Sequence, residues 1–380
     1  MTMALEQPAT DRASAPTTTV AAPANAPSTR PLAALLGPRA LAALVPAADV
    51  PMGLWRKVLV DPVQELLIRP GKGFRARLTE IAFRLAGGQG QPPPALAAML
   101  EVVHAGSMIV DDIEDDSLER RGGPTVHRIH GVPLALNAGN WMYFAPFALL
   151  RDLGLGADAE LHLHRCVSRV LLDCHFGQAL DLGARPGEVR QTQIADVVKT
   201  MSVLKTGRLL ALAAEAGAIT AGASGARAIA LADFGEALGV GLQMLDDLGN
   251  LSGRAPADKR YEDLRCGRLT WPWAWAASQL DETKFAGLVD ERDRLEREEK
   301  ADLHAGPALR PKPARWQPLA VSLRGLVGAH GRLAVHWHLR EALCQLRDDL
   351  NAAPGADADA AAPVMDALER EIARLEASYG

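Results

Sequence analysis

The fold is decided by Met108–Pro124, which reads MIVDDIEDDSLERRGGP. An apolar run precedes the charges, so a helix is expected, and residues four apart on a helix share one face. Asp111 and Asp115 would then lie one turn apart, where like charges repel each other by roughly a few tenths of a kcal/mol. Hard cations such as Mg²⁺ bind carboxylate oxygens and complete their coordination with water and phosphate oxygens. The stretch therefore predicts a magnesium–diphosphate site, with Arg120 and Arg121 as further phosphate partners.

A second acidic pair supports this interpretation. The segment Gly241–Asn250, GLQMLDDLGN, is another apolar helical run that carries Asp246 and Asp247. Taken alone, DDIEDD could be a solvated acidic turn, because runs of charge usually face water. Two aspartate pairs inside apolar segments are harder to explain as surface, and they favour two carboxylate clusters that share one ligand.

Composition narrows the class of protein. The 380 residues are 48% hydrophobic but only 4% aromatic, so the core must be built from Ala, Leu and Val, which favours helix over sheet. The net charge of −5 and the lack of a basic stripe argue against a nucleic-acid partner. No apolar run reaches membrane-spanning length without charges, so no transmembrane segment and a cytoplasmic location are expected.

Cysteines and most histidines carry no recognisable metal pattern. The four cysteines lack CxxC spacing and are interpreted as thiols of a reducing compartment. The histidines interpreted as structural are His127, His130, His162, His164 and His175.

The chain is expected to form one large all-α domain after a disordered tail. Residues 1–30 are rich in Ala, Pro and Thr without periodicity, and residues 31–380 are assigned to the helical domain. The first aspartate helix should open at the prolines 92–94 and end at the glycines 122–123. Other helices are expected over 74–85, 134–150, 159–180, 189–216, 224–251, 271–280, 281–302, 319–351 and 361–378. A Pro-rich connector is expected over 304–317, and no convincing strand is evident.

Residues 111–140, DDIEDDSLERRGGPTVHRIHGVPLALNAGN, resemble the first aspartate-rich motif of the trans-isoprenyl diphosphate synthases, also called polyprenyl synthetases. The likeness is greatest to geranylgeranyl diphosphate synthases and extends over about 70–272. It implies an all-helical fold of the isoprenoid synthase type with a central cavity, three Mg²⁺ ions when substrate is bound, and a homodimer. It also implies isopentenyl diphosphate and allylic diphosphates of the C5–C15 range as substrates.

The resemblance also implies roles for individual residues. The metal ligands are Asp111, Asp112, Asp115 and Asp246, and the catalytic set adds Lys205 and Asp247. The substrate-binding set is Lys72, Arg75, His104, Arg120, Arg121, Lys205, Thr206, Gln243, Lys259 and Arg268. Two positions depart from the family pattern: Leu242 replaces a phenylalanine, and Arg268 replaces a lysine, so that a planar fork stands where a point charge is usual. Gln178 and Asp181, in GQALDL, match a family segment and could equally make a structural hydrogen bond.

Product length should depend on the helix before Asp111. Val103, Gly106 and Ser107 are small, whereas short-chain relatives carry a large aromatic residue there, so a C20 product is expected. Two alternatives stay open. A class I terpene cyclase needs both metal motifs but no isopentenyl clamp, and a non-catalytic regulatory subunit of a prenyl diphosphate synthase typically loses an aspartate motif.

Overall fold

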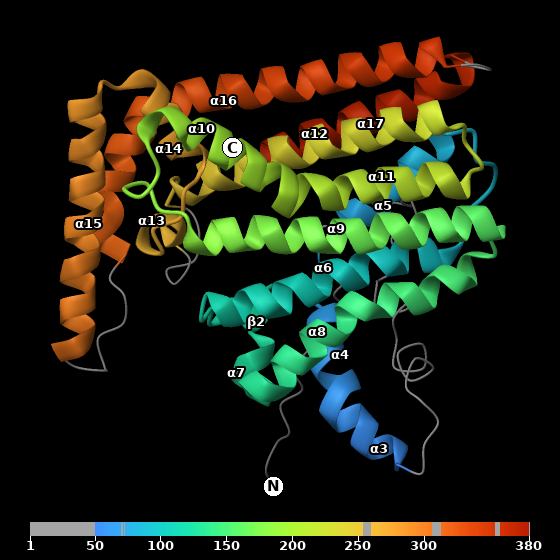
Figure 1. The fold of residues 1–380 in the computed structure, drawn as a ribbon, viewed down its shortest axis with the longest axis horizontal. Helices are drawn as coiled ribbons and strands as arrows, with labels where there is room; N and C mark the ends of the chain where they lie inside the picture. The colour runs from blue at the N-terminus through green and yellow to red at the C-terminus, as the bar shows by residue number, and fades with distance from the viewer. Residues whose placement is uncertain are drawn as a thin grey trace, which may run out of the picture.

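Helices make up nearly all of the regular structure (Figure 1). The computed structural model describes residues 50–69, 71, 73–253, 260–305, 313–353 and 358–379. The predicted tail and the start of the predicted domain, residues 1–49, lie outside this part. Within the described residues the first elements are α3 (Met52–Trp55), the π-helix η1 (Arg56–Val60), α4 (Asp61–Leu67), α5 (Phe74–Leu85) and α6 (Pro94–Glu114).

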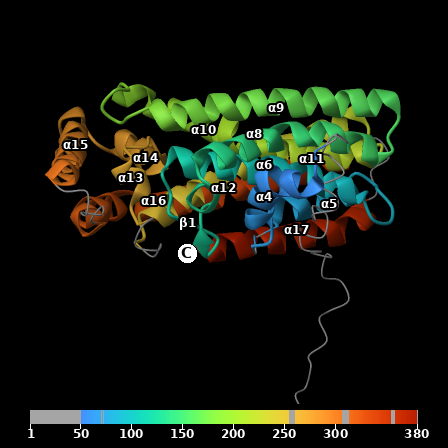
Figure 2. The same ribbon diagram turned by 90° about the horizontal axis from the view of Figure 1, so that it is seen from below.

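The middle of the chain forms the body of the bundle. Its elements are β1 (Glu119–Arg120), β2 (Gly123–Pro124), α7 (Val126–His130), α8 (Val132–Leu149), the 3₁₀ turn η2 (Leu150–Leu153), α9 (Ala157–Gly183), the 3₁₀ turn η3 (Gln191–Gln193), α10 (Ile194–Ser202), the π-helix η4 (Val203–Gly207), α11 (Arg208–Thr220) and α12 (Gly225–Asn250). Helix α6 packs on α8, and α11 lies between α5 and α12. Viewed from below, α9 runs along one long side of the molecule and α17 along the opposite side (Figure 2).

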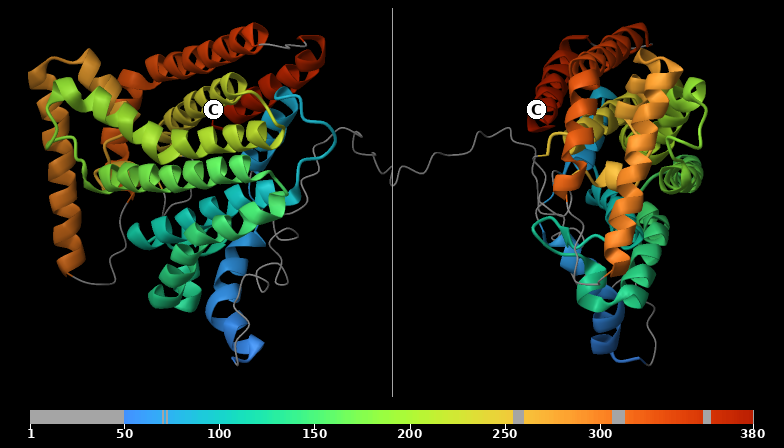
Figure 3. Two further views of the ribbon diagram at one scale, coloured as in Figure 1. Left: turned by 45° about the vertical axis from the view of Figure 1, so that its right-hand side comes forward. Right: turned by 90° about the vertical axis from the view of Figure 1, so that its left-hand side faces the viewer.

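The remaining elements are α13 (Glu262–Arg265), α14 (Trp271–Gln279), α15 (Glu282–Ala305), α16 (Pro313–Ala352) and α17 (Ala358–Tyr379). Helix α15 lies across one end of the bundle, and α16 packs along α12 (Figures 1 and 3). The Arg77 Nε donates to Glu371 Oε1 at 2.7 Å and ties α17 to α5. The predicted all-α fold and the charged helix after residue 281 are confirmed, while α16 begins at Pro313, inside the predicted connector.

The end of the first aspartate helix was predicted wrongly. Helix α6 ends at Glu114, and the chain then turns into a hairpin in which β1 and β2 pair antiparallel. Arg121 and Gly122, the two loop residues, have φ values of 52° and 76°, as a tight two-residue hairpin turn requires. Arg69, two residues after α4, donates from Nη1 to the Arg120 carbonyl at 2.7 Å and from Nη2 to Glu65 of α4 at 2.8 Å, which ties this hairpin to α4.

The predicted helix over 189–216 is interrupted by a π turn. Residues 189–190 precede the 3₁₀ turn, and η4 inserts one wide turn between α10 and α11. Two glycines allow neighbouring helices to approach it: a Cβ at Gly177 would lie 2.4 Å from the Lys205 backbone nitrogen, and one at Gly239 would lie 2.6 Å from the Gly207 Cα. Because π turns change which side chains face a neighbouring helix and recur at functional sites, η4 marks a candidate site.

One described helix, α12, is long and apolar enough by composition to cross a bilayer, although no such run was expected from the sequence. Of its most apolar window, 61% is buried inside the protein, and the helix carries the second aspartate pair. This burial is the pattern of a core helix.

Candidate active site

A cavity of about 290 Å³ opens between α6, α8, α9, η4, α11 and α12. It is lined by residues far apart in the sequence: Arg75, Val103, His104, Ser107, Met108, Val110, Asp111, Glu114, Arg120, Tyr143, Leu171, Cys174, His175, Gln178, Lys205, Thr206, Leu209, Gln243 and Asp246. Charged and polar groups and apolar side chains share this one space. The predicted central cavity is thus present, and both aspartate motifs reach it.

Asp111 and Asp246 line the cavity from opposite helices, α6 and α12. Asp111 accepts from Arg120 Nη2 at 3.2 Å and from Gln178 Nε2 at 3.2 Å, and Lys205 Nζ lies 3.5 Å away. Burial raises the pKa of Asp111, but Lys205 and Arg120 outweigh it, and the net pKa lies below the ordinary value. Asp111 therefore stays ionised beside Lys205 and Arg120.

Asp112 does not line the cavity, in contrast to its predicted metal-binding role. Its side chain is 1% exposed, and its Oδ1 accepts from Arg120 Nε at 2.7 Å. Consecutive residues on a helix point about 100° apart, and in α6 this turns the Asp112 side chain toward the β1–β2 hairpin while Asp111 lines the cavity. Asp112 instead holds the guanidinium that reaches Asp111.

Asp115 belongs to a buried network of charges behind the cavity. Arg268 donates to both Asp115 and Asp181, and Lys205 Nζ donates to Asp181 Oδ2 at 2.7 Å. Burial and then the neighbouring Asp111 raise the pKa of Asp115. The fork of Arg268 serves two carboxylates at once, which a lysine in its place could not do with the same planar geometry.

Asp247 was predicted to be catalytic, but both of its oxygens face protein donors. Oδ1 accepts from Gln243 Nε2 and Oδ2 from the Trp271 backbone N–H, each at 2.8 Å. Burial raises the pKa of Asp247 to about 7. Gln243 in turn accepts from the Thr206 hydroxyl at 2.7 Å. Asp247 therefore positions Gln243 and Thr206, which do line the cavity.

Three residues of the predicted isopentenyl diphosphate-binding set, Arg75, His104 and Arg121, lie in the described part of the chain. Arg75 and His104 line the cavity, and the guanidinium of Arg121 lies so close to Gly71 that a Cβ there would be 2.8 Å from it. Burial and then Arg75 hold the pKa of His104 well below its ordinary value, so His104 is neutral. Lys72 and Lys259 lie outside the described residues.

The predicted chain-length residues separate into two groups. Val103 and Ser107 line the cavity. Gly106 faces α8 instead, because a Cβ there would lie 2.8 Å from the Met142 Cβ and 2.9 Å from the Gly139 carbonyl oxygen. Its expected place in the cavity floor is wrong, and its small size serves helix packing.

Four polar residues at the site were missed or left undecided by sequence reasoning. Gln178 donates to Glu114 Oε2 at 2.7 Å as well as to Asp111, and Asp181 holds Lys205 and Arg268. The rings of Tyr143 and His175 pack edge to face at 5.0 Å in the cavity wall. The GQALDL segment was a usable signal for Gln178 and Asp181, whereas nothing in the sequence distinguished Tyr143.

The polyprenyl synthetase family profile matches residues 56–304, which is most of the chain and includes both aspartate motifs. The chain belongs to the polyprenyl synthetase family. Structural similarity gives the same fold: a geranylgeranyl pyrophosphate synthase superimposes with a TM-score of 0.69 at 22% identity, covering 91% of this chain and 95% of that one. A decaprenyl diphosphate synthase from Rhodobacter capsulatus superimposes with a TM-score of 0.65 at 24% identity, covering 92% and 98%.

Two relatives in sequence carry different product names. A geranylgeranyl pyrophosphate synthase of Penicillium paxilli is 31% identical over 57% of this chain and 56% of its own length. A geranylfarnesyl diphosphate synthase of Aeropyrum pernix is 30% identical over 58% of this chain and 70% of its own length. The similarity therefore spans only part of each relative, and the named products differ in length.

The donors at the cavity suit a hard divalent cation. Asp111, Glu114 and Asp246 offer carboxylate oxygens to one space, which is the ligand type that Mg²⁺ prefers. Arg75, Arg120 and Lys205 line the same space and suit the phosphate oxygens that such an ion shares. The residues present fit a metal–diphosphate pair.

Proposed function

We propose that this protein condenses isopentenyl diphosphate with an allylic diphosphate to form a longer trans-prenyl diphosphate, most simply the C20 product. The main support for the proposal is that Asp111 and Asp246 line one cavity. Lys205 and Arg120 lie beside Asp111 in that cavity. Mg²⁺ bound by these carboxylates would supply positive charge to the departing diphosphate.

The residues of the chain account for the other requirements of the reaction. As the allylic carbon–oxygen bond breaks, negative charge grows on the diphosphate, and Lys205 and Arg120 stabilise it where it develops. Asp181 keeps Lys205 oriented through its 2.7 Å contact. His104, being neutral, donates a hydrogen bond to the second diphosphate without adding charge next to Arg75.

The carbon–carbon bond then forms between the isopentenyl double bond and the allylic carbon, and a proton passes to the released diphosphate. No protein nucleophile is needed. The apolar side chains Val103, Leu171 and Leu209 line the cavity and exclude water, which would otherwise convert the cation to an alcohol. The C20 length rests on the small side chains at 103 and 107, which leave the space open.

One assay tests the proposal. Purified protein is incubated with Mg²⁺, isopentenyl diphosphate and each of the C5, C10 and C15 primers, and the products are identified by mass. Condensation with at least one primer and a main C20 product are expected. Cyclic hydrocarbons without condensation would favour a terpene cyclase, and no product with any primer would favour a regulatory subunit, so either result refutes the proposal.

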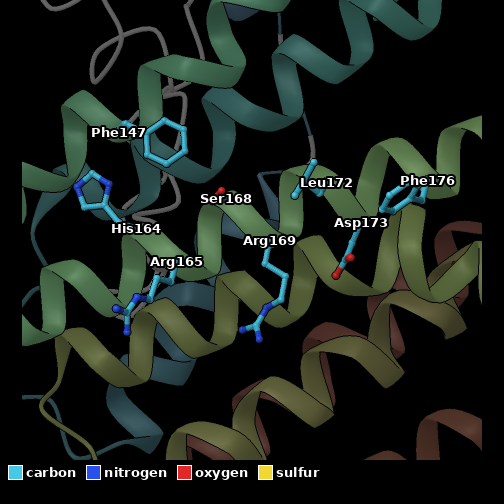
Figure 4. A pocket seen from close by; sticks show the side chains of 8 residues that line it. All are labelled: Phe147, His164, Arg165, Ser168, Arg169, Leu172, Asp173 and Phe176. Carbon is cyan, nitrogen blue, oxygen red and sulfur yellow. The ribbon is translucent and has the colours of Figure 1, made fainter.

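We also propose that the chain forms a homodimer through α8 and α9. Exposed apolar side chains gather on these two helices, with Phe144 68% and Phe176 62% exposed. A surface hollow of about 540 Å³ lies on the outer face of α9 between Phe147 and Phe176 (Figure 4). Exposed apolar patches of this kind mark interaction sites, and a two-fold dimer uses the same patch twice.

A further inference from the structure

A second cluster of metal-binding side chains lies outside the catalytic cavity, between α9 and α11. His162 Nε2 is 3.2 Å from Glu215 Oε1, and Cys166 Sγ is 3.4 Å from the same oxygen. All three donor atoms lie within 4.8 Å of one another. None of these residues lines the cavity or takes part in the proposed reaction.

The spacing along the helices explains how the donors meet. His162 and Cys166 are four residues apart on α9 and share one face, while Glu215 reaches them from α11. Between Leu209 and Thr220, Glu215 is the single charged residue in a run of apolar and small side chains. His162 was interpreted as structural and Cys166 as a thiol because neither has metal-type spacing in the sequence, and Glu215 lies 49 residues beyond Cys166.

Two of the three donor separations are those of a tetrahedral site for a borderline-soft cation. Zn²⁺ binds nitrogen, oxygen and sulfur at about 2.0–2.3 Å, so neighbouring ligand atoms around it are about 3.3–3.6 Å apart. The separations from Glu215 to His162 and to Cys166, 3.2 and 3.4 Å, are close to this range, and the donor atoms of His162 and Cys166 lie within 4.8 Å of each other. An imidazole, a thiolate and a carboxylate together favour Zn²⁺ over Mg²⁺, which requires an octahedral shell of oxygens.

We propose that His162, Cys166 and Glu215 bind Zn²⁺, which cross-links α9 to α11 and leaves one coordination position for water. The surroundings suit such a site, because Cys166 is 1% exposed while the His162 side chain is 57% exposed and gives the ion a path from solvent. Binding of the ion would release the thiol proton of Cys166, because the thiolate is the form that binds a metal. Arg169, whose Nη2 is 3.8 Å from the sulfur, favours the thiolate that remains (Figure 4 shows Arg169 on α9).

Cobalt(II) is a direct probe because a thiolate ligand gives it an intense charge-transfer absorption, which carboxylate sites do not produce. Chelator-treated full-length protein is titrated with Co²⁺ in excess Mg²⁺, which occupies the aspartate motifs. One equivalent should give the band in the wild type and in Cys344→Ser, a control at an exposed cysteine. The band should be absent in Cys166→Ser, and Zn²⁺ should abolish it in the wild type.

A second variant protects the test against a folding defect in Cys166→Ser. Because His162 is exposed, His162→Gln should keep the wild-type circular dichroism and prenyltransferase activity. Loss of even an outer-shell partner weakens metal binding about 10–100-fold, so loss of this direct ligand should weaken Co²⁺ binding by at least about tenfold. The proposal is overturned if the wild type gives no thiolate band, if Cys166→Ser retains it, or if His162→Gln binds Co²⁺ as tightly as the wild type. The Co²⁺ absorption, the Co²⁺ affinity and the circular dichroism do not depend on whether the protein condenses prenyl diphosphates.

Discussion

Replacing Asp181 by Asn should remove a carboxylate that holds both Lys205 and Arg268, and should destabilise the fold. Asp181 accepts from both Lys205 and Arg268, and its side chain is 9% exposed against 28% for Lys205. Removing one partner of a buried ion pair costs about 3–5 kcal/mol. Lys205 keeps contact with water and with Asp111, and Arg268 keeps Asp115, so neither cation is left unpaired. We therefore expect a smaller loss, about 2 kcal/mol in the free energy of unfolding.

The protein contains its own control for this experiment. Asp281 lies 2.8 Å from Lys284 Nζ, almost the distance in the Asp181–Lys205 pair, but these side chains are 56% and 71% exposed. Asp281→Asn should therefore leave urea unfolding unchanged. Asp181→Asn should also lower kcat by up to about 100-fold, because Lys205 loses its orientation. Equal free energies of unfolding for the two variants would refute the claim that the buried Asp181 network stabilises the fold.

Four further outcomes are expected. Ser107→Phe should shorten the main prenyl product measured by mass, and an unchanged profile would remove position 107 from the cavity floor. Gly106→Ala should instead cost about 1–3 kcal/mol in urea unfolding without shifting product length, because its Cβ would meet Met142 and the Gly139 carbonyl. The double variant Phe144→Asp/Phe176→Asp should halve the mass measured by light scattering, whereas an unchanged mass would exclude the α8–α9 interface. The folded pKa of His104 is lowered by burial and Arg75 from 6.5, so the unfolded chain takes up its proton first as the pH falls. The free energy of unfolding should thus decrease from about pH 7 to about pH 5, and decrease less in His104→Gln.

Much of the fold and of the site could be predicted because both depend on local pattern. Apolar spacing with few aromatic residues indicated the helices, and the boundaries of 74–85 were predicted correctly. The predictions failed where the backbone leaves a regular helix. The hairpin after α6 depends on the left-handed conformation of Arg121, and the π turn depends on close approach at Gly177. Neither the hairpin nor the π turn changes the spacing of apolar residues, so neither could be predicted from that spacing.

The presence of two aspartate motifs in apolar helices with cations nearby could be predicted from the sequence, because charge and helical spacing are local properties. Which carboxylates face the cavity could be seen only in the folded chain. Asp111 and Asp246 reach it, whereas Asp112 and Asp247 turn to Arg120 and to Gln243. Adjacent residues on a helix point in different directions, and which direction meets the cavity depends on how each helix packs against the others.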